Sequence, residues 1–269
     1  MKRESPANIP LLIENFGAGP VALRGSDFNF DFEAGIEASL IHDNPNLPAP
    51  LEARYFWIDD CTDSHSIGGL TNARVNTTPQ GAAISTLNFA NYTSQLQSFE
   101  LHFRKQISSD LTVLAGFRYI SFDEDLDILL DGFDRYWWGI ENDVFGFQVG
   151  AEKVLYDNCC GFRIEGTAKV GIYGNDASVA SQVQLVEPQP ISEGNGMDHT
   201  AFVGELGLFG THDMSCCWSV RAGYQVIWLD GVLVAANQVP ATDNNALTID
   251  FDYADAFFHG ALIQLERRW

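Results

Sequence analysis

Apolar and polar residues alternate along most of this chain. In residues 162–174, FRIEGTAKVGIYG, the apolar Phe162, Ile164 and Val170 share one parity, and the charged Arg163 and Glu165 share the other. Because successive side chains of a β-strand point to opposite faces, the pattern predicts a strand with one apolar and one charged face. A soluble sheet would bury the apolar face, whereas a membrane barrel would turn it to lipid and line its interior with the charges.

The same alternation recurs along the chain and predicts nine strands. They are residues 28–40, 51–59, 99–107, 111–122, 144–154, 162–174, 201–210, 218–229 and 257–269, with Phe28, Phe30 and Phe32 on the apolar face of the first. The connections 41–50, 108–110, 155–161 and 211–217 are short, and 60–95, 123–143, 174–200 and 230–256 are predicted to be long loops. Short turns at one end and long loops at the other are typical of an outer-membrane barrel.

Aromatic residues gather near the predicted strand ends, where a membrane barrel carries its interfacial girdles. Trp218 and Trp228 lie ten steps apart on one strand, which spans roughly 25 Å at ~3.3 Å per residue and ~40° tilt. The charged exceptions on apolar faces, Lys105, Lys153 and Arg267, fall near short turns, where a charge costs little. The predicted interface aromatics are Tyr55, Trp57, Tyr119, Trp218, Trp228 and Trp269.

These patterns predict an all-β fold, an antiparallel up-and-down transmembrane β-barrel of about ten strands, with eight as the alternative. Its turns would be short and periplasmic, and its loops long and extracellular. Nine strands place the two chain ends on opposite sides, so an even number needs one more strand, either within residues 9–24 or upstream of the sequence. We assign residues 1–26 to an N-terminal segment, either one strand or a plug or linker, and residues 27–269 to a single barrel domain.

The composition of the chain excludes some kinds of partner and membrane anchor. The formal net charge of −21 over 269 residues argues against nucleic acid and against docking onto anionic lipid. No apolar run approaches the ~20 residues of a transmembrane helix. The first twenty residues lack the apolar core and cleavage site of a signal peptide, so either the chain is cytosolic or an export signal has been removed or lies upstream.

If the apolar faces turn to lipid, acids and bases from neighbouring strands meet inside. Such a mixture can select a solute in a polar channel, or it can fill a small barrel with ion pairs, since eight strands enclose little more than their own side chains. The predicted lumen-lining residues are Glu33, Glu37, Glu52, Arg54, Glu100, His102, Arg104, Arg118, Glu152, Arg163, Glu165, Lys169, Glu205, Arg221, Glu266 and Arg268.

Cysteines and loop acids supply the remaining candidate chemistry. The vicinal pairs Cys159, Cys160 and Cys216, Cys217 lie on two short turns whose strands are consecutive, so we predict a disulfide between the turns, with Cys61 unpaired. Their spacing is not the CxxC of zinc sites. In the predicted loop at 123–143, Asp123, Asp125 and Asp127 are weak candidates for a divalent-cation site, and a solvated acidic loop is the other interpretation.

A set of phrases in fixed order resembles a known family. LEARYFWIDD, LAGFRYISFDEDL, VFGFQVGAE, FRIEGTAKVGIYGN, FVGELGLFG, GYQVIWLDGVLVA and FFHGALIQLE together are similar to a family of outer-membrane β-barrel, porin-like proteins abundant in planctomycetes. The likeness runs from about residue 27 to the C-terminus. It implies export, an outer-membrane location in a Gram-negative envelope and a barrel fold, and it carries no catalytic residues.

The function predicted from these features is passive, porin-like passage of ions or small solutes through a narrow charged lumen. One alternative is a non-conducting scaffold or adhesion barrel in the same membrane. The other is a soluble, lipocalin-like barrel that binds a lipophilic ligand between inward apolar faces. No motif selects any of the six histidines for catalysis, so we predict no enzyme and no cofactor. The expected partners are the lipid bilayer and divalent cations at the acidic loops.

Overall fold

The structure is a computed structural model that describes residues 1–14, 19–43, 45–68, 70, 73–77, 87–130, 134–158, 161–184, 188–195, 199–216, 218–243 and 248–267. Its strands are β1 (Lys2–Arg3), β2 (Pro10–Ile13), β3 (Val21–Arg24), β4 (Gly35–His42), β5 (Leu51–Gly68), β6 (Arg74–Val75), β7 (Leu87–Ser108), β8 (Leu111–Leu130), β9 (Asp134–Asp157), β10 (Phe162–Gln184), β11 (Pro188–Asn195), β12 (His199–Asp213), β13 (Trp218–Leu233), β14 (Thr242–Asp243), β15 (Thr248–Ile249) and β16 (Tyr253–Arg267). A 3-10 turn covers Gly25–Asp27 and one helix, α1, covers Ala235–Ala241.

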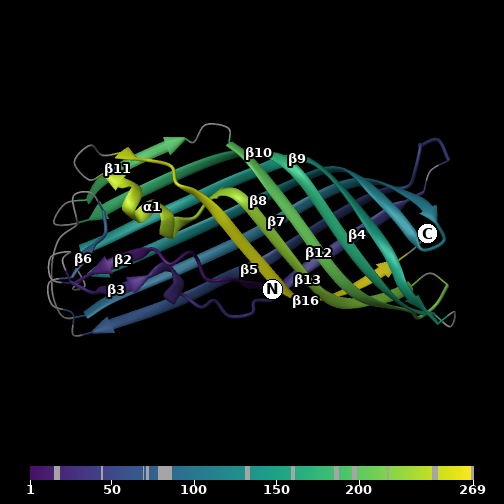
Figure 1. The fold of residues 1–269 in the computed structure, drawn as a ribbon, viewed down its shortest axis with the longest axis horizontal. Helices are drawn as coiled ribbons and strands as arrows, with labels where there is room; N and C mark the ends of the chain where they lie inside the picture. The colour runs from purple at the N-terminus through teal and green to yellow at the C-terminus, as the bar shows by residue number, and fades with distance from the viewer. Residues whose placement is uncertain are drawn as a thin grey trace.

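One large antiparallel sheet dominates the molecule. Its strands follow the order β1-β16-β13-β12-β10-β9-β8-β7-β5-β4, with β11 beside β10, and all its pairings are antiparallel. The sheet curls until inner faces from opposite parts of the order meet, so we call it the barrel (Figure 1). The prediction of an all-β, antiparallel fold with sequential hairpins is confirmed.

The two ends of the barrel differ. The predicted short turns are confirmed, since two to eight residues separate β4, β7, β9 and β12 from the next strand of the sheet, and we call this the short-turn end. The predicted long loops are mostly wrong, because β5, β7, β8, β9 and β10 run far into them. Residues 123–130 belong to β8 and 134–143 to β9. Apolar residues keep alternating with acids there, and that alternation sustains the strands.

Along the long strands, the outward side chains change from apolar to polar and the inward side chains change from polar to apolar. In β8 the outward side chains are apolar or aromatic from Val113 to Tyr119 and polar or acidic from Ser121 to Asp127, while the inward ones change from Arg118 to Ile120 and Phe122. β7 and β9 invert in the same way. The apolar belt, defined as the outward residues of 99–103, 111–119, 145–151, 168–172, 202–208 and 218–228, therefore covers only the half next to the short turns. The soluble alternative, with apolar residues inward throughout, does not describe this half.

The other half, which we call the long-strand end, has an apolar core. Inward residues of β7, β8 and β9 pack there with the segment before β4 and with α1; the largest members are Tyr92, Phe122, Trp138, Phe28 and Phe30. Figure 1 shows α1, β2 and β3 together at this end. We call residues 4–14 and 19–30, with α1, the plug. No described helix is long and apolar enough to cross a membrane.

The N-terminal half of the predicted first strand, residues 28–34, is wrong. The strand begins only at Gly35, and Phe28 and Phe30 are fully buried in the core instead of facing outward. The ring of Phe28 meets Tyr92 edge-on at 5.2 Å, and Phe30 does so at 5.4 Å. Their alternation is that of a strand, but burying the two rings against the inner wall stabilises the fold more than adding them to the strand would. Residues 1–26 contribute β1, β2 and β3.

Candidate functional site

Five ionised side chains converge inside the half that the apolar belt surrounds. Glu205 of β12 lies 2.7 Å from Arg54 of β5, 2.7 Å from Arg118 of β8 and 3.1 Å from Lys169 of β10. Glu100 of β7 accepts from Arg54 at 3.0 Å and from Lys169 at 2.8 Å. All five side chains are at least nine-tenths buried. Contacts between β5 and β12, which lie far apart in the sheet order, show how tightly the barrel closes around this central cluster.

A second layer of charges lies nearer the short turns. Arg104 donates to Glu52 at 2.7 Å and also to Glu152. Arg163 pairs with Glu165 at 2.6 Å and with Asp213 at 3.1 Å. These side chains keep some contact with solvent, unlike the central cluster. The lumen is therefore wetted from the short-turn end and dry in the middle.

The lumen is narrow at the level of the central cluster, whose side chains are buried. The cavity bounded by Glu37, Glu52, Arg54, Glu152, Lys169 and Glu205 among others measures about 20 Å³, which is about the space of one water molecule. Phe209 points inward there, with the Arg221 guanidinium 4.0 Å from its ring centre. Gly207 and Gly223 give its ring room, because a Cβ at either would stand within 2.5 Å of it. Above the cluster the apolar core begins.

The structure places most predicted lumen residues on the inner wall. Glu37 and Gln225 extend the central cluster through Arg54, at 2.5 and 2.9 Å, and His102 lies 2.5 Å from Gln148. Glu33 is an exception, because it precedes β4 and its backbone pairs with Met1 instead of its carboxylate joining the cluster. The side chain of Glu266 and residue Arg268 lie outside the described residues.

Sequence reasoning missed a polar site inside the apolar core. Glu124 accepts from Tyr92 at 2.5 Å, from Arg3 at 3.2 Å and from the backbone N–H of Ala235 at 3.0 Å. This buried carboxylate therefore ties the wall to β1 and to the amino end of α1. The available signal was parity, because Glu124 is the one acid of β8 that shares the inward parity of Phe122 and Leu126.

Aromatic side chains form a row where the outward face changes. Tyr55, Phe99, Tyr119 and Phe145 are direct cross-strand neighbours on β5, β7, β8 and β9, and we call them the aromatic row. Of the other predicted interface aromatics, Trp228 and Trp218 point outward at the two ends of the belt on β13, and Trp57 lies two residues beyond Tyr55 of the row. Trp269 lies outside the described residues.

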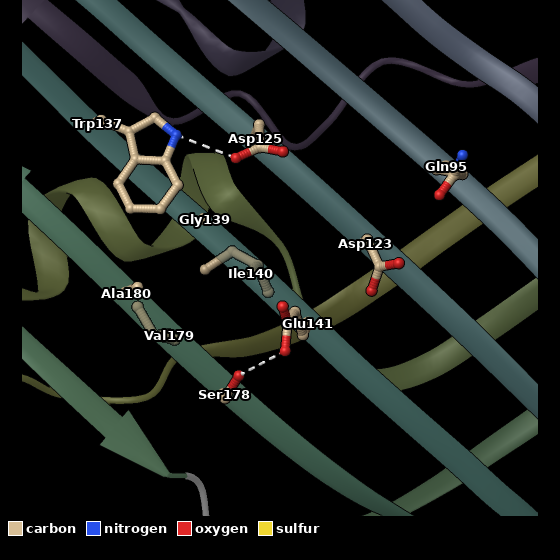
Figure 2. Close-up of a pocket in the computed structure, with 10 residues that line it drawn as sticks. All are labelled: Gln95, Asp123, Asp125, Trp137, Gly139, Ile140, Glu141, Ser178, Val179 and Ala180. Carbon is tan, nitrogen blue, oxygen red and sulfur yellow. Dashed lines mark hydrogen bonds between the residues drawn. The ribbon is translucent and has the colours of Figure 1, made fainter.

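An acidic hollow of about 550 Å³ lies on the outer wall just above the aromatic row. Figure 2 shows Asp123, Asp125 and Glu141 on neighbouring strands, with Trp137 over Gly139 and its Nε1 donating to Asp125 at 3.0 Å. Burial raises the pKa of Asp123 and of Asp125, and neighbouring carboxylates act in the same direction.

The predicted cation site is not assembled. Asp123, Asp125 and Asp127 follow one another along the outward face of β8, not around a loop, so their carboxylates are spread along the strand. Asp127 pairs with Arg135 at 2.7 Å. Among the described residues, no three His, Cys, Asp or Glu side chains are placed to hold a metal ion.

The cysteines divide between described and undescribed positions. Cys61 is a buried, unpaired thiol in the apolar core. Cys216 is exposed on its short turn. Cys159, Cys160 and Cys217 lie outside the described residues, so the disulfide between the two turns stays a prediction.

Comparison with solved structures finds chains that are similar to this one. The toluene transporter TbuX of Ralstonia pickettii is similar to this chain at 16% identity and a TM-score of 0.29, with 84% of this chain and 71% of that chain covered. No family model and no curated protein sequence matches the chain. The resemblance to the planctomycete-type family therefore stays a prediction.

Proposed function

We propose that this chain is an outer-membrane β-barrel whose charged half spans the bilayer and whose lumen is closed at rest. In this proposal the short turns are periplasmic and the long-strand end, with its acidic outer wall, stands outside the membrane. Passage of ions or small solutes then requires the central cluster and the plug to move. A barrel that never opens, and serves as a scaffold, is the second candidate.

The inversion of the outward face at the aromatic row carries the membrane assignment. The part of β8 at the level of the belt, residues 111–119, is nine residues long. A tilted transmembrane strand needs about 9–11 residues. Phe147 and Leu206, with 74% and 59% of their surface exposed, would be costly in water but are suited to lipid. Lys105 and Lys153 stay at the short-turn edge of the belt, where they reach the headgroups.

The filled lumen favours a closed resting state over an open porin. Bilayer-spanning barrels that conduct solutes freely have about 16 strands and a water-filled interior. Here ion pairs of 2.7–3.1 Å cross the lumen and the plug covers one end of it. The second candidate is favoured by the same observation, so the two are separated by whether the barrel can be opened.

Membrane insertion is tested by refolding the purified chain into lipid vesicles. We expect it to require detergent for solubility, to float with the vesicles and to migrate on a gel at a position that changes on heating. A chain that stays monomeric in buffer without detergent, and does not float with vesicles, would overturn the membrane assignment.

Closure is tested by conductance in planar bilayers. We expect the wild type to show no steps above leak. A combined variant, Arg54→Ser with Glu205→Ser in the lumen and Glu124→Gln at the plug, should show small steps if the lumen is a gated route. Steps from the wild type would contradict the closed lumen, and silence from both proteins would favour the scaffold.

A further inference from the structure

An apolar groove crosses the belt on β9, β10, β12 and β13 and continues onto β16. It measures about 530 Å³, and its larger outward lining residues are Val149, Val170, Leu206, Val226, Trp228 and Phe257. Between them the small Ala168 and Gly204 form a low floor. The nearest atom to a Cβ added at Gly204 would belong to Trp228, at 3.8 Å. Five neighbouring strands span about 19 Å, so the groove has the shape of an extended apolar chain.

A polar cluster stands at the β16 end of the groove. His259 shares the outward parity of Phe257 and lies opposite Val226, and its ring centre is 6.0 Å from that of Phe257. Its Nε2 lies 2.7 Å from Glu4 Oε1, and its Nδ1 bonds to the Tyr224 hydroxyl. Ionisable groups on a lipid-facing surface are costly and indicate a functional site. We call Glu4, Tyr224 and His259 the polar triad.

The polar triad lies near the outer edge of the belt. The backbone N–H of Glu4 donates to the carbonyl of Phe257 at 2.9 Å. Phe257 lies opposite Trp228, which is near the level where the outward face becomes polar. The Glu4 side chain is 47% exposed, so in the proposed membrane location its carboxylate reaches the lipid head groups. From there the groove leads into the belt toward Val149, which is four residues from Phe145 of the aromatic row.

The polar triad offers acceptors for further hydrogen bonds, because its own members use its donors. A carboxylate only accepts, so His259 Nε2 carries the hydrogen of its bond with Glu4, and Nδ1 of the neutral ring takes the hydrogen of the Tyr224 hydroxyl. Among the described residues the structure gives Glu4 Oε2 no partner, and the Tyr224 oxygen keeps its lone pairs. A bound group must therefore bring donors, and a positive charge suits the carboxylate. A primary ammonium brings three donors, whereas a quaternary ammonium brings none.

We propose that the groove and the polar triad together bind one membrane lipid, with a primary ammonium head group at Glu4 and an acyl chain in the groove. The inference rests on the proposed membrane function, because a barrel in a bilayer presents this face to lipid. The ammonium donates to Glu4 Oε2 and to the Tyr224 oxygen, and the chain lies over Gly204 and Ala168. Its positive charge offsets the cost of a carboxylate at the edge of the hydrocarbon.

Trp228 lines the groove, so its fluorescence reports on the occupant. Proteins that keep Trp228 as their sole tryptophan are placed in vesicles of phosphatidylethanolamine and phosphatidylcholine, which share a phosphate and differ in the methyl groups on nitrogen. Only one of the two lipids carries bromines, near the head-group end of its chains. We expect brominated phosphatidylethanolamine to quench about threefold to fivefold more effectively at equal mole fraction, the range of an exposed ion pair. Glu4→Gln should remove the preference, and Asp176→Asn, at an exposed outward acid of β10, should keep it.

Gly204→Leu fills the groove and should also remove the preference. Its control is Gly174→Leu, at an outward glycine with similar room, 3.7 Å from Phe145. Equal quenching by the two lipids, or a preference that survives Glu4→Gln or Gly204→Leu, would overturn the inference, as would a preference that either control removes. Flotation of each protein with vesicles is measured in parallel. If the proteins float and the lipids quench equally, only the lipid site is wrong; if none floats, the membrane proposal fails first.

Discussion

Glu205 is the residue on which the lumen charges converge. Its carboxylate meets Arg54, Arg118 and Lys169, and only 3% of its side chain is exposed. Taking these ions out of water costs several kcal/mol each, and their mutual attraction offsets that cost only while every partner is present. The cluster is therefore a poor source of net stability but a strong constraint on which strands face one another.

We expect Glu205→Gln to lower the free energy of unfolding by about 3–5 kcal/mol, because it leaves three buried cations short of one negative charge. Unfolding in urea from lipid vesicles, followed by tryptophan fluorescence, measures the loss. Arg135→Ala is the matched control, since the Arg135–Asp127 pair is half exposed and should be worth less than about 1 kcal/mol. Equal losses in the two variants would contradict the buried-cluster account.

The raised pKa of Asp123 makes the stability of the protein depend on pH. Burial raises its pKa, Ser121 lowers it by a hydrogen bond, and Glu141 and Asp143 raise it further. The pKa of Asp123 is therefore higher in the folded state than in the unfolded chain, and the folded state binds the proton first as the pH falls. The free energy of unfolding then rises as the pH falls through the folded-state pKa of Asp123, and the ionised carboxylate lowers it at neutral pH.

Asp123→Asn should therefore stabilise the protein at pH 7 and flatten its stability between neutral and mildly acidic pH. The measurement is the urea midpoint of wild type and variant at both pH values. The result counts against this reasoning if the variant is less stable at pH 7, or if the two proteins respond to pH alike.

At the scale of the element, each long strand carries two opposite patterns in series. The outward side chains change from apolar to polar at the level of the aromatic row. The free-energy cost of an outward charge should therefore depend on its position along the strand. On β9, Val149 lies amid the belt, opposite Ala115 and Val170. On β10, Gln182 faces outward well above the row.

We expect Val149→Arg to cost about 2–4 kcal/mol in vesicles and Gln182→Arg about 0–1 kcal/mol, because only the first places a guanidinium in hydrocarbon. The free energy of unfolding in urea is measured for both, and again in detergent micelles, where the difference should shrink. Equal costs for the two arginines in vesicles would place the belt in water.

Much of this element-level arrangement could be predicted from the sequence. Parity puts Arg118 and Glu205 on the charged faces of their strands, because the side-chain period of a strand is two, and the membrane-barrel interpretation turns those faces inward. It could not say that Arg54 meets Glu205, since the two are 151 residues apart in the chain and only the curl of the sheet joins them. The extent of β8 was missed because acids at 123, 125 and 127 suggest solvent, and the inward Leu126 and Ile128 between them were given too little weight.

Local alternation also fails where tertiary burial overrides it. Phe28 and Phe30 alternate as a belt strand would, yet both pack inside against Tyr92. Nothing near them in the sequence marks the difference, because it arises from an inner wall that is apolar only at the long-strand end. Glu124 shows the converse case, in which an apparent loop acid is a buried anchor for the plug.

At the scale of the whole molecule, the proposed membrane location confines the bilayer to one part of the barrel, between the short turns and the aromatic row. Two tryptophans of β13 lie at the two ends of the belt. Trp218 adjoins the short-turn end and Trp228 lies near the level where the outward face becomes polar, and both are about two-fifths exposed. Trp138 is fully buried in the apolar core, its Nε1 donating to Thr242 at 3.0 Å.

Single-tryptophan proteins in brominated lipid vesicles test this placement. Bromines near the headgroups should quench Trp218 and Trp228 more than bromines deep in the acyl chains, because indole rings settle at the two interfaces of a membrane barrel. Trp138 should respond to neither lipid, since the protein wall and the plug shield it. Quenching of Trp138 to the same degree as Trp228 would mean that lipid reaches the long-strand end. Stronger deep than shallow quenching of Trp228 would move the outer interface above the aromatic row, and the acidic wall at Asp123 and Glu141 would then be forced into hydrocarbon.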